Sequence, residues 1–201
     1  MKKVLFLAVS LFAVVFAANA EESGSVKPAA GKVNVEVGFC PFSNLGGEVG
    51  LENGRLNGGY SINNNISVRA GLGWNVKSTD DEATDTKTDN RTISFAPGIT
   101  YSFKGTNKFT PYIGGELIFE AGNDKTKVNG KTTEDLDNRG FGVDAFTGMN
   151  YYFSQNLYVG VEFGIGFMYT SKDEDNDGDN AYKTTTFAPY AQPSVRLGWV
   201  F

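Results

Sequence analysis

The feature that most constrains this chain is a two-residue alternation of apolar side chains with small or polar ones, repeated in eight segments. Successive side chains of a β-strand point to opposite faces, so this alternation predicts strands with one apolar face. Most segments approach or exceed the ~9–11 residues that a tilted membrane-spanning strand needs. They cover residues 33–39, 55–62, 66–77, 93–103, 111–121, 141–151, 157–169 and 187–201.

The connections between these segments are of two kinds that alternate along the chain. Residues 63–65, 104–108 and 154–156 are short connections, whereas 41–54, 78–91, 123–139 and 171–185 are longer and polar. Short turns at one end and long loops at the other are typical of outer-membrane barrels. The sequence therefore predicts an all-β fold, an eight-stranded antiparallel up-and-down transmembrane β-barrel over residues 32–201. With an even number of strands, both mature termini are expected in the periplasm.

A soluble lipocalin-like barrel would alternate as well, and two observations favour the membrane. The non-apolar positions are rich in glycine and charge, which suits a tight lumen, so the apolar set is expected to face outward. Aromatic residues also gather near the segment ends, for example Tyr101 and Trp199 at one end and Trp74 and Phe167 at the other. Such aromatic girdles mark the two membrane interfaces.

The first twenty residues have the build of a cleaved signal peptide. Lys2 and Lys3 precede an apolar run, and Ala18-Asn19-Ala20 places small residues at the cleavage positions. The run is shorter than the roughly 20 apolar residues that a membrane-spanning helix needs. We expect a signal peptide over residues 1–20 and a short periplasmic lead over 21–31.

Composition narrows the functional classes. With 18 basic and 23 acidic residues, the chain has a net charge of −5, which argues against a nucleic-acid partner. It contains no histidine, the commonest general base and metal ligand, and we therefore expect no enzyme activity. Cys40, the single cysteine, cannot form a disulfide within the chain.

Several charged residues fall on the inward-facing positions of the predicted strands. An eight-stranded barrel has an interior just wide enough for its own side chains, so these charges need partners. We expect Arg196 to pair with Glu36 or Glu162, and Arg69 to meet Glu116 or a neighbouring acid. Such a network either plugs the lumen or forms a narrow gate. The complete predicted set is Glu36, Arg55, Arg69, Glu116, Glu120, Asp144, Glu162 and Arg196.

Two connections are acidic, residues 78–90 and 172–180, as is usual for solvated loop tips. The second resembles the start of a calcium loop, with oxygen ligands at alternate positions: Asp173, Asp175, Asp177 and Asp179. Its twelfth position is Thr184 instead of glutamate, so only a weak calcium site within residues 171–184 is conceivable, and no other cofactor is expected.

The last strand carries a family resemblance. Val195, Leu197, Trp199 and Phe201 alternate up to the final residue and resemble the C-terminal signal by which outer-membrane barrels are recognised by their assembly machinery. Together with the strand layout, this is similar to the small outer-membrane β-barrel family that includes OmpX, OmpW and the OmpA membrane domain. The resemblance implies outer-membrane lipids, lipopolysaccharide and the assembly machinery as partners.

Two functions remain open at this stage. One is a structural or surface-binding barrel that acts through its outer loops, on a host or surface ligand that the sequence does not identify. The other is a narrow channel or transporter for ions or for small or apolar solutes. An apolar cavity would favour the transporter, and its expected lining is Phe146, Ile118, Met168 and Tyr190.

Overall fold

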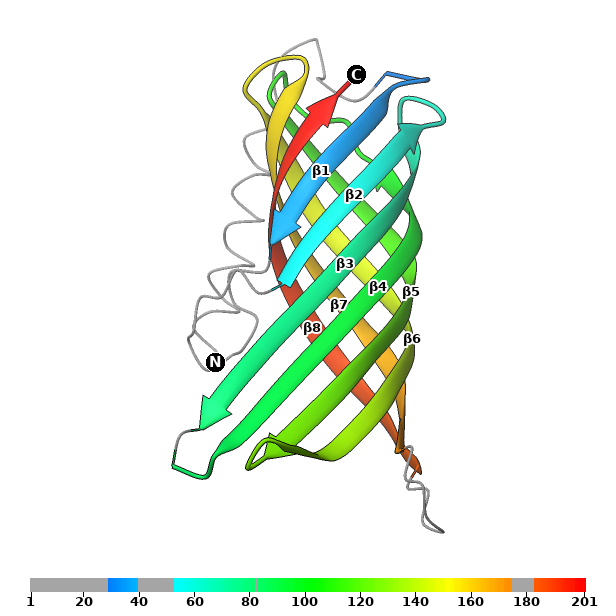
Figure 1. Cartoon of the computed structure of the whole chain (residues 1–201). Coiled ribbons are helices and arrows are strands. Elements are labelled where there is room, and N and C mark those ends of the chain that lie inside the picture. The colour runs from blue at the N-terminus through cyan, green and yellow to red at the C-terminus, as the bar shows by residue number, and fades with distance from the viewer. Residues whose placement is uncertain (1–28, 40–52, 82, 175–182) are drawn as a thin grey trace, which may run out of the picture.

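A computed structural model describes residues 29–39, 53–81, 83–174 and 183–201 of the 201-residue chain. They form eight strands that close into one antiparallel barrel, in which each strand pairs with its neighbours in sequence and β1 pairs with β8 (Figure 1). This confirms the predicted fold class. The strands are β1 Val33–Phe39, β2 Asn53–Ser61, β3 Ile66–Asp81, β4 Thr86–Ser102, β5 Phe109–Val128, β6 Lys131–Tyr152, β7 Leu157–Glu174 and β8 Lys183–Val200. None of the described residues forms a helix long and apolar enough to cross a membrane.

The barrel is apolar outside and polar inside. Large apolar side chains on every strand are exposed on the outer wall, Ile93 by 69% and Leu72 by 51%. The buried polar and charged residues include Glu36, Arg69 and Arg196. Because the side-chain period of a strand is two, the alternation of the sequence separates these two sets onto opposite faces of the wall.

Pairs of aromatic rings mark both edges of the apolar wall. Near the short turns, Tyr151 contacts the rings of Phe109 and Phe153 at centroid distances of 4.9 and 5.0 Å. Near the opposite edge, Phe167 stacks on Phe187 at 5.4 Å. The two groups correspond to the aromatic girdles that border a membrane-spanning wall.

The short turns share one local device. Asn63, Thr106 and Ser154 each lie within a short connection and accept hydrogen bonds from backbone N–H groups two and three residues later. The two bonds to Asn63 are both 2.8 Å long. Short polar side chains favour such turns because they satisfy backbone donors that no strand partner reaches. We call this end of the barrel the short-turn end.

At the opposite end, called here the long-hairpin end, the prediction that residues 78–91 and 123–139 form loops is wrong. Strands β3 and β4 stay paired up to Asp81 and Thr86, and β5 and β6 up to Val128 and Lys131. The alternation of polarity ends in these hairpins because both of their faces contact water, although the ladder of backbone hydrogen bonds continues. The tip of the second hairpin is Asn129-Gly130, both with positive φ, a dipeptide that favours tight hairpin turns.

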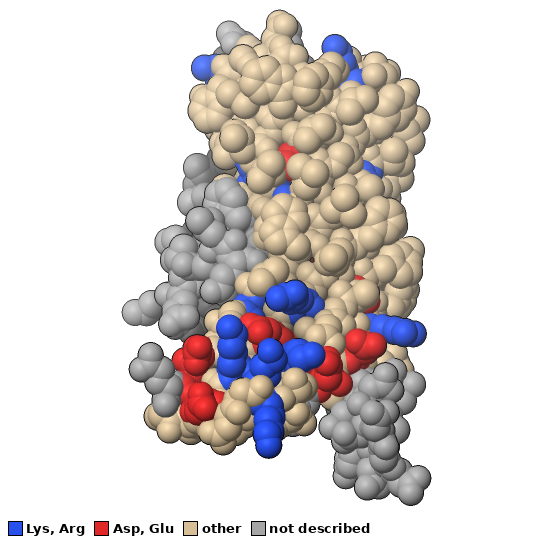
Figure 2. Space-filling view, viewed as in Figure 1, with Lys and Arg blue, Asp and Glu red and all other residues tan. Residues whose placement is uncertain are grey.

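Charged side chains gather at the long-hairpin end, whereas the wall of the barrel is almost free of them in the same view (Figure 2). Residues 41–52 of the first predicted loop and residues 175–182 of the last lie outside the described residues, as do residues 1–28 with the predicted signal peptide.

Candidate functional site in the barrel lumen

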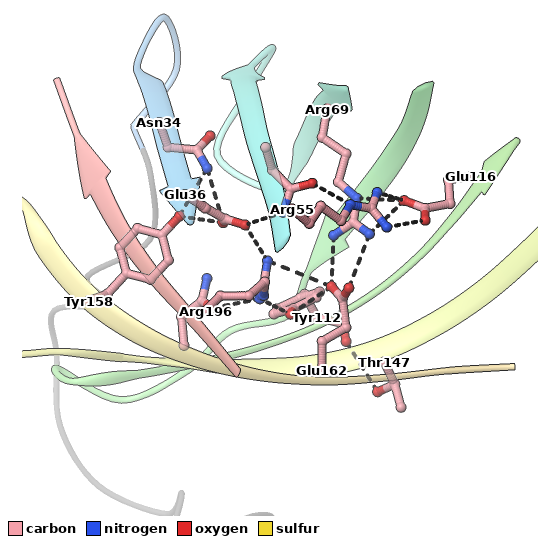
Figure 3. Close-up of polar contacts among 12 residues, drawn as sticks. Asn34, Glu36, Arg55, Arg69, Tyr112, Glu116, Thr147, Tyr158, Glu162 and Arg196 are labelled. Carbon is pink, nitrogen blue, oxygen red and sulfur yellow. Dashed lines mark hydrogen bonds and ion pairs between the residues drawn. The ribbon is translucent and has the colours of Figure 1, made fainter. Parts of the chain in front are cut away.

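Arg69 stands at the centre of the lumen, between two carboxylates that come from distant strands. Its Nη2 lies 2.7 Å from Glu116 Oε2, and its Nη1 lies 2.7 Å from Glu162 Oε2. Arg69 belongs to β3, whereas the acids belong to β5 and β7, so these ion pairs cross the barrel (Figure 3). The guanidinium also lies over the ring of Phe146, 3.7 Å from its centroid.

Arg55 extends the cluster on one side. Its Nη1 and Nη2 donate to the two carboxylate oxygens of Glu116, each at 2.7 Å. Two parallel bonds of this kind are the strong form of an arginine–carboxylate pair. Glu116 therefore holds two arginines at once, and its side chain is fully inaccessible to solvent.

Arg196 extends the cluster on the other side. Its Nη1 lies 2.6 Å from Glu36 Oε2 and 3.7 Å from Glu162 Oε2, while Nη2 donates to the hydroxyl of Tyr112 and to Asn150. The structure thus places Arg196 against both Glu36 and Glu162. Since β1 and β8 adjoin each other, this contact lies beside the seam that closes the barrel.

Two tyrosines complete the cluster toward the short-turn end. The Tyr158 hydroxyl donates to Glu36 Oε1 at 2.5 Å, and the Tyr112 hydroxyl donates to Glu162 Oε2 at 3.0 Å. The Asn34 amide donates to the Tyr158 oxygen at 2.9 Å. These residues were not among the predicted lumen residues, although Tyr112 and Tyr158 share the inward positions of the acids. We call the eight residues that form this network the ion-pair cluster: Glu36, Arg55, Arg69, Tyr112, Glu116, Tyr158, Glu162 and Arg196.

Glycine makes room for these large side chains. Arg196 has Gly38 and Gly160 as its neighbours on the two adjoining strands, and Arg69 has Gly59 and Gly98. A Cβ atom added to Gly160 would stand 2.9 Å from Arg196 Nη2. The inward glycines of the sequence are therefore matched to long side chains on neighbouring strands.

The ion-pair cluster is electrically balanced, with three arginines facing three glutamates. Burying a charge is costly unless it is paired and hydrogen-bonded, and this arrangement supplies both. Side chains from β1, β2, β3, β5, β7 and β8 meet across the lumen at this level. The arrangement can lock the wall strands to one another and obstruct passage along the barrel axis.

The two remaining predicted lumen acids lie apart from the cluster. Glu120 and Asp144 line a cavity of about 310 Å³ on the long-hairpin side, and neither forms a hydrogen bond or ion pair with a residue that the structure describes. The cavity is lined mainly by glycine, polar and charged residues. Of the four residues expected to line an apolar cavity, Ile118 lines it. Phe146 packs under Arg69, and the side chain of Tyr190 lies outside the described ones.

The other predicted sites have different positions. Val195, Leu197, Trp199 and Phe201 lie at the end of β8 and just beyond it; Trp199 and Leu197 pair with Val35 and Val37 of β1. In the weak calcium motif, the side chain of Asp173 and the whole of Asp175, Asp177 and Asp179 lie outside the described residues. Elsewhere, the described part of the chain has no group of three or more acids suited to a metal ion.

Two carboxyl groups on the long hairpins, beyond the apolar wall, have shifted acidity. The Ser78 hydroxyl donates to Asp89 at 2.6 Å, and this bond lowers the pKa of Asp89. Asp135 accepts from the Lys125 ammonium at 2.8 Å and from the Asn123 amide at 2.6 Å, and these bonds lower the pKa of Asp135. Both acids are partly exposed, so the shifts in their pKa values reflect local contacts of the hairpins.

Comparison with known families gives one match. The sequence model described as "Outer membrane protein beta-barrel domain" matches residues 4–191. A search of curated proteins found no match.

Solved structures share the fold at low sequence identity. OprG from Pseudomonas aeruginosa matches with a TM-score of 0.58 and 14% identity, over 88% of this chain and 99% of that one. A major outer membrane protein from Thermus thermophilus matches with a TM-score of 0.54 and 17% identity, over 86% and 99%. Ail, the attachment invasion locus protein of Yersinia pestis, matches with a TM-score of 0.50 and 14% identity, over 86% and 99%. At these identities the likeness concerns the fold alone.

Proposed function

We propose a function from the following premise: this chain belongs to the outer membrane protein beta-barrel domain family. As a member it is an outer-membrane β-barrel. Our proposal is that its lumen does not conduct and that it acts as a structural, surface-binding protein through its long-hairpin end. The observation that carries the proposal is the ion-pair cluster, which joins six of the eight strands across the lumen.

Conductance of the refolded barrel in planar bilayers tests the closed lumen. We expect the wild-type barrel to show no conductance, because ion pairs between the strands hold the side chains of the cluster in place across the lumen. Replacing Arg69 with Ala removes the central guanidinium and should produce conducting events. Arg139→Ala, at an exposed residue of the hairpin formed by β5 and β6, should not. Steady conductance of the wild-type barrel would contradict the proposal.

One observation favours a narrow channel as a second candidate. The cavity of about 310 Å³ reaches the ion-pair cluster from the long-hairpin side, so a passage would require the cluster, with its two tyrosines, to move. A channel of this kind would pass ions or small polar solutes, given the polar lining. It predicts steady wild-type conductance that changes when Arg69 or Glu116 is neutralised.

The proposed orientation places the long hairpins outside the cell and the short turns in the periplasm. An epitope inserted between Asn129 and Gly130, at a hairpin tip, should be labelled by antibody on intact cells. The same epitope within residues 63–65 should be labelled only after the outer membrane is permeabilised. The reverse pattern would overturn the orientation and the surface role with it.

A first probe for surface binding is a polyanion. Lys87 and Lys127 are directly opposed on β4 and β5, an unfavourable pair unless an anion bridges them. Ail has been solved with the heparin analogue sucrose octasulfate, and lipopolysaccharide also carries phosphates. We expect saturable binding of sucrose octasulfate that Lys87→Gln weakens and that Lys108→Gln, a change at an exposed lysine of the short-turn end, does not. Binding that both variants leave unchanged would remove this pair from the surface role.

Export and assembly complete the proposal. The mature chain is expected to begin at Glu21, which N-terminal sequencing of the outer-membrane protein would check. Phe201 is proposed to serve the assembly machinery, because its exposed side chain ends the alternating stretch of β8. Phe201→Ala should reduce assembly in cells while purified protein still refolds in detergent. Equal assembly of both proteins in cells would argue against the signal.

A further inference from the structure

Among the described residues, one larger and one smaller cavity lie on opposite sides of the ion-pair cluster. The cavity of about 310 Å³, called here the chamber, is lined by Arg55, Glu162 and Arg196 of the cluster and by Glu120 and Asp144. The other, of about 50 Å³, lies among Tyr112, Tyr158 and their neighbours. An eight-stranded barrel fills its interior with side chains when these are large. The chamber is therefore a space that the sequence leaves open.

The chamber lining holds more acidic than basic side chains. The three arginines of the cluster form ion pairs with Glu36, Glu116 and Glu162, whereas Glu120 and Asp144 form no ion pair within the described lumen. Asp144 also stands directly opposite Glu116 on the neighbouring strand. A concave site of one sign with low-dielectric walls concentrates ions of the opposite sign.

A buried acceptor beside the chamber lacks the hydrogen bond that it needs. Asp144 Oδ1 accepts no hydrogen bond from any residue that the structure describes. Leaving a buried polar atom unpaired is unfavourable. An apolar occupant would leave this oxygen unsatisfied, whereas an N–H donor such as an ammonium group can satisfy it.

The spacing of the two acids favours an organic cation over a metal ion. Asp144 is the register partner of Glu116, which precedes Glu120 by four residues on β5. At about 3.3 Å per residue, the two acids stand roughly 13 Å apart along the strand direction. A metal ion needs its oxygen ligands within about 2.6 Å, so one ion cannot use both. A chain with ammonium groups at its two ends can.

We propose that the chamber binds a small organic cation, an aliphatic amine with two ammonium groups, between Asp144 in its depth and Glu120 nearer the long-hairpin end. This goes beyond the surface role proposed above and does not depend on it. The chamber lies on the long-hairpin side of the ion-pair cluster, so an amine that enters from that end does not have to pass the cluster.

Isothermal titration of the refolded full-length mature barrel in uncharged detergent tests the proposal, with 1,4-diaminobutane as the probe. We expect saturable binding of one diamine per barrel. Asp144→Asn and Glu120→Gln should each weaken it about tenfold, as the loss of a charge-assisted hydrogen bond does. The matched variant Asp135→Asn, on an exposed hairpin acid, should bind as the wild type does. Heat-shifted gel migration verifies that each variant is folded.

Two further ligands test whether the chamber recognises the two ammonium groups of the diamine. The neutral isostere 1,4-butanediol should not bind, and calcium should not compete with the diamine. The proposal is overturned if millimolar diamine gives no saturable heat, if its affinity is the same in Asp144→Asn, or if butanediol or calcium takes its place. None of these results alters the expected silence in planar bilayers, so the two proposals fail separately.

Discussion

The two halves of the lumen are built on opposite plans. Toward the short-turn end, tyrosines and asparagines fill the interior, and Tyr158 is only 1% exposed. Toward the long-hairpin end, small residues leave a chamber, and two carboxylates in it lack ionic partners among the described residues. The ion-pair cluster separates the two. The same eight strands can therefore enclose a rigid, filled layer at one level and an open site at another. The difference depends on the inward-facing side chains alone.

The sharpest way to break this contrast is to remove the central charge of the filled half. Arg69→Met leaves Glu116 with one arginine, and it leaves Glu162 with the Tyr112 hydroxyl and a longer contact to Arg196. We expect the free energy of unfolding to fall by about 3–5 kcal/mol, because buried acids lose their partner. Urea unfolding of the refolded barrel measures it, with Arg139→Met as the exposed control. A midpoint equal to that of the wild type would show that the ion pairs do not stabilise the fold.

The fit between glycine and tyrosine provides the next test. Tyr112 lies over Gly148, and a Cβ there would collide with its ring and stand 2.7 Å from the carbonyl oxygen of Val161. We expect Gly148→Ala to cost about 1–3 kcal/mol by overpacking. Gly58→Ala, where nothing lies within 4 Å, is the matched control and should be nearly neutral. Equal urea midpoints for the two variants would mean that the filled half accommodates the added methyl group without strain.

The open half should respond with the opposite sign. Asp144→Asn removes an unpaired charge that stands opposite Glu116, so stability should rise, by less than about 1 kcal/mol. The same urea experiment measures it, in the absence of amines. A loss of stability comparable to that of Arg69→Met would mean that Asp144 belongs to the cluster, and the two halves would no longer differ.

The smallest effect concerns the hairpins beyond both halves. The pKa of Asp135 is lowered by Lys125 and Asn123. A lowered pKa in the folded state means that these contacts contribute stability above the ordinary pKa of an aspartate and lose it as the pH falls through the folded value. Lys125→Met should raise the pKa of Asp135 toward its ordinary value, as followed by NMR titration. An unchanged pKa would show that the ion pair does not persist in solution.

Comparison of sequence and structure explains why the two long hairpins were predicted to be loops. Residues 123–139 read as a loop because neither face of this hairpin is apolar above the membrane. The strand nevertheless continues, since the backbone ladder between β5 and β6 does not require an apolar face. The signal that could have revealed it is Asn129-Gly130 between threonine-rich segments, a pattern of tight hairpins.

What the sequence by itself determined is the wall. The alternation decides that the chain is all-β, which residues face outward, and that arginines and acids share the lumen, because the side-chain period of a strand is fixed. Only the tertiary structure decided which of them meet. Arg55 reaches Glu116, 61 residues away, and Arg196 reaches Glu36, 160 residues away, because closure and strand stagger set the depth of each side chain. The chamber is also a property of closure, since no single strand contains it.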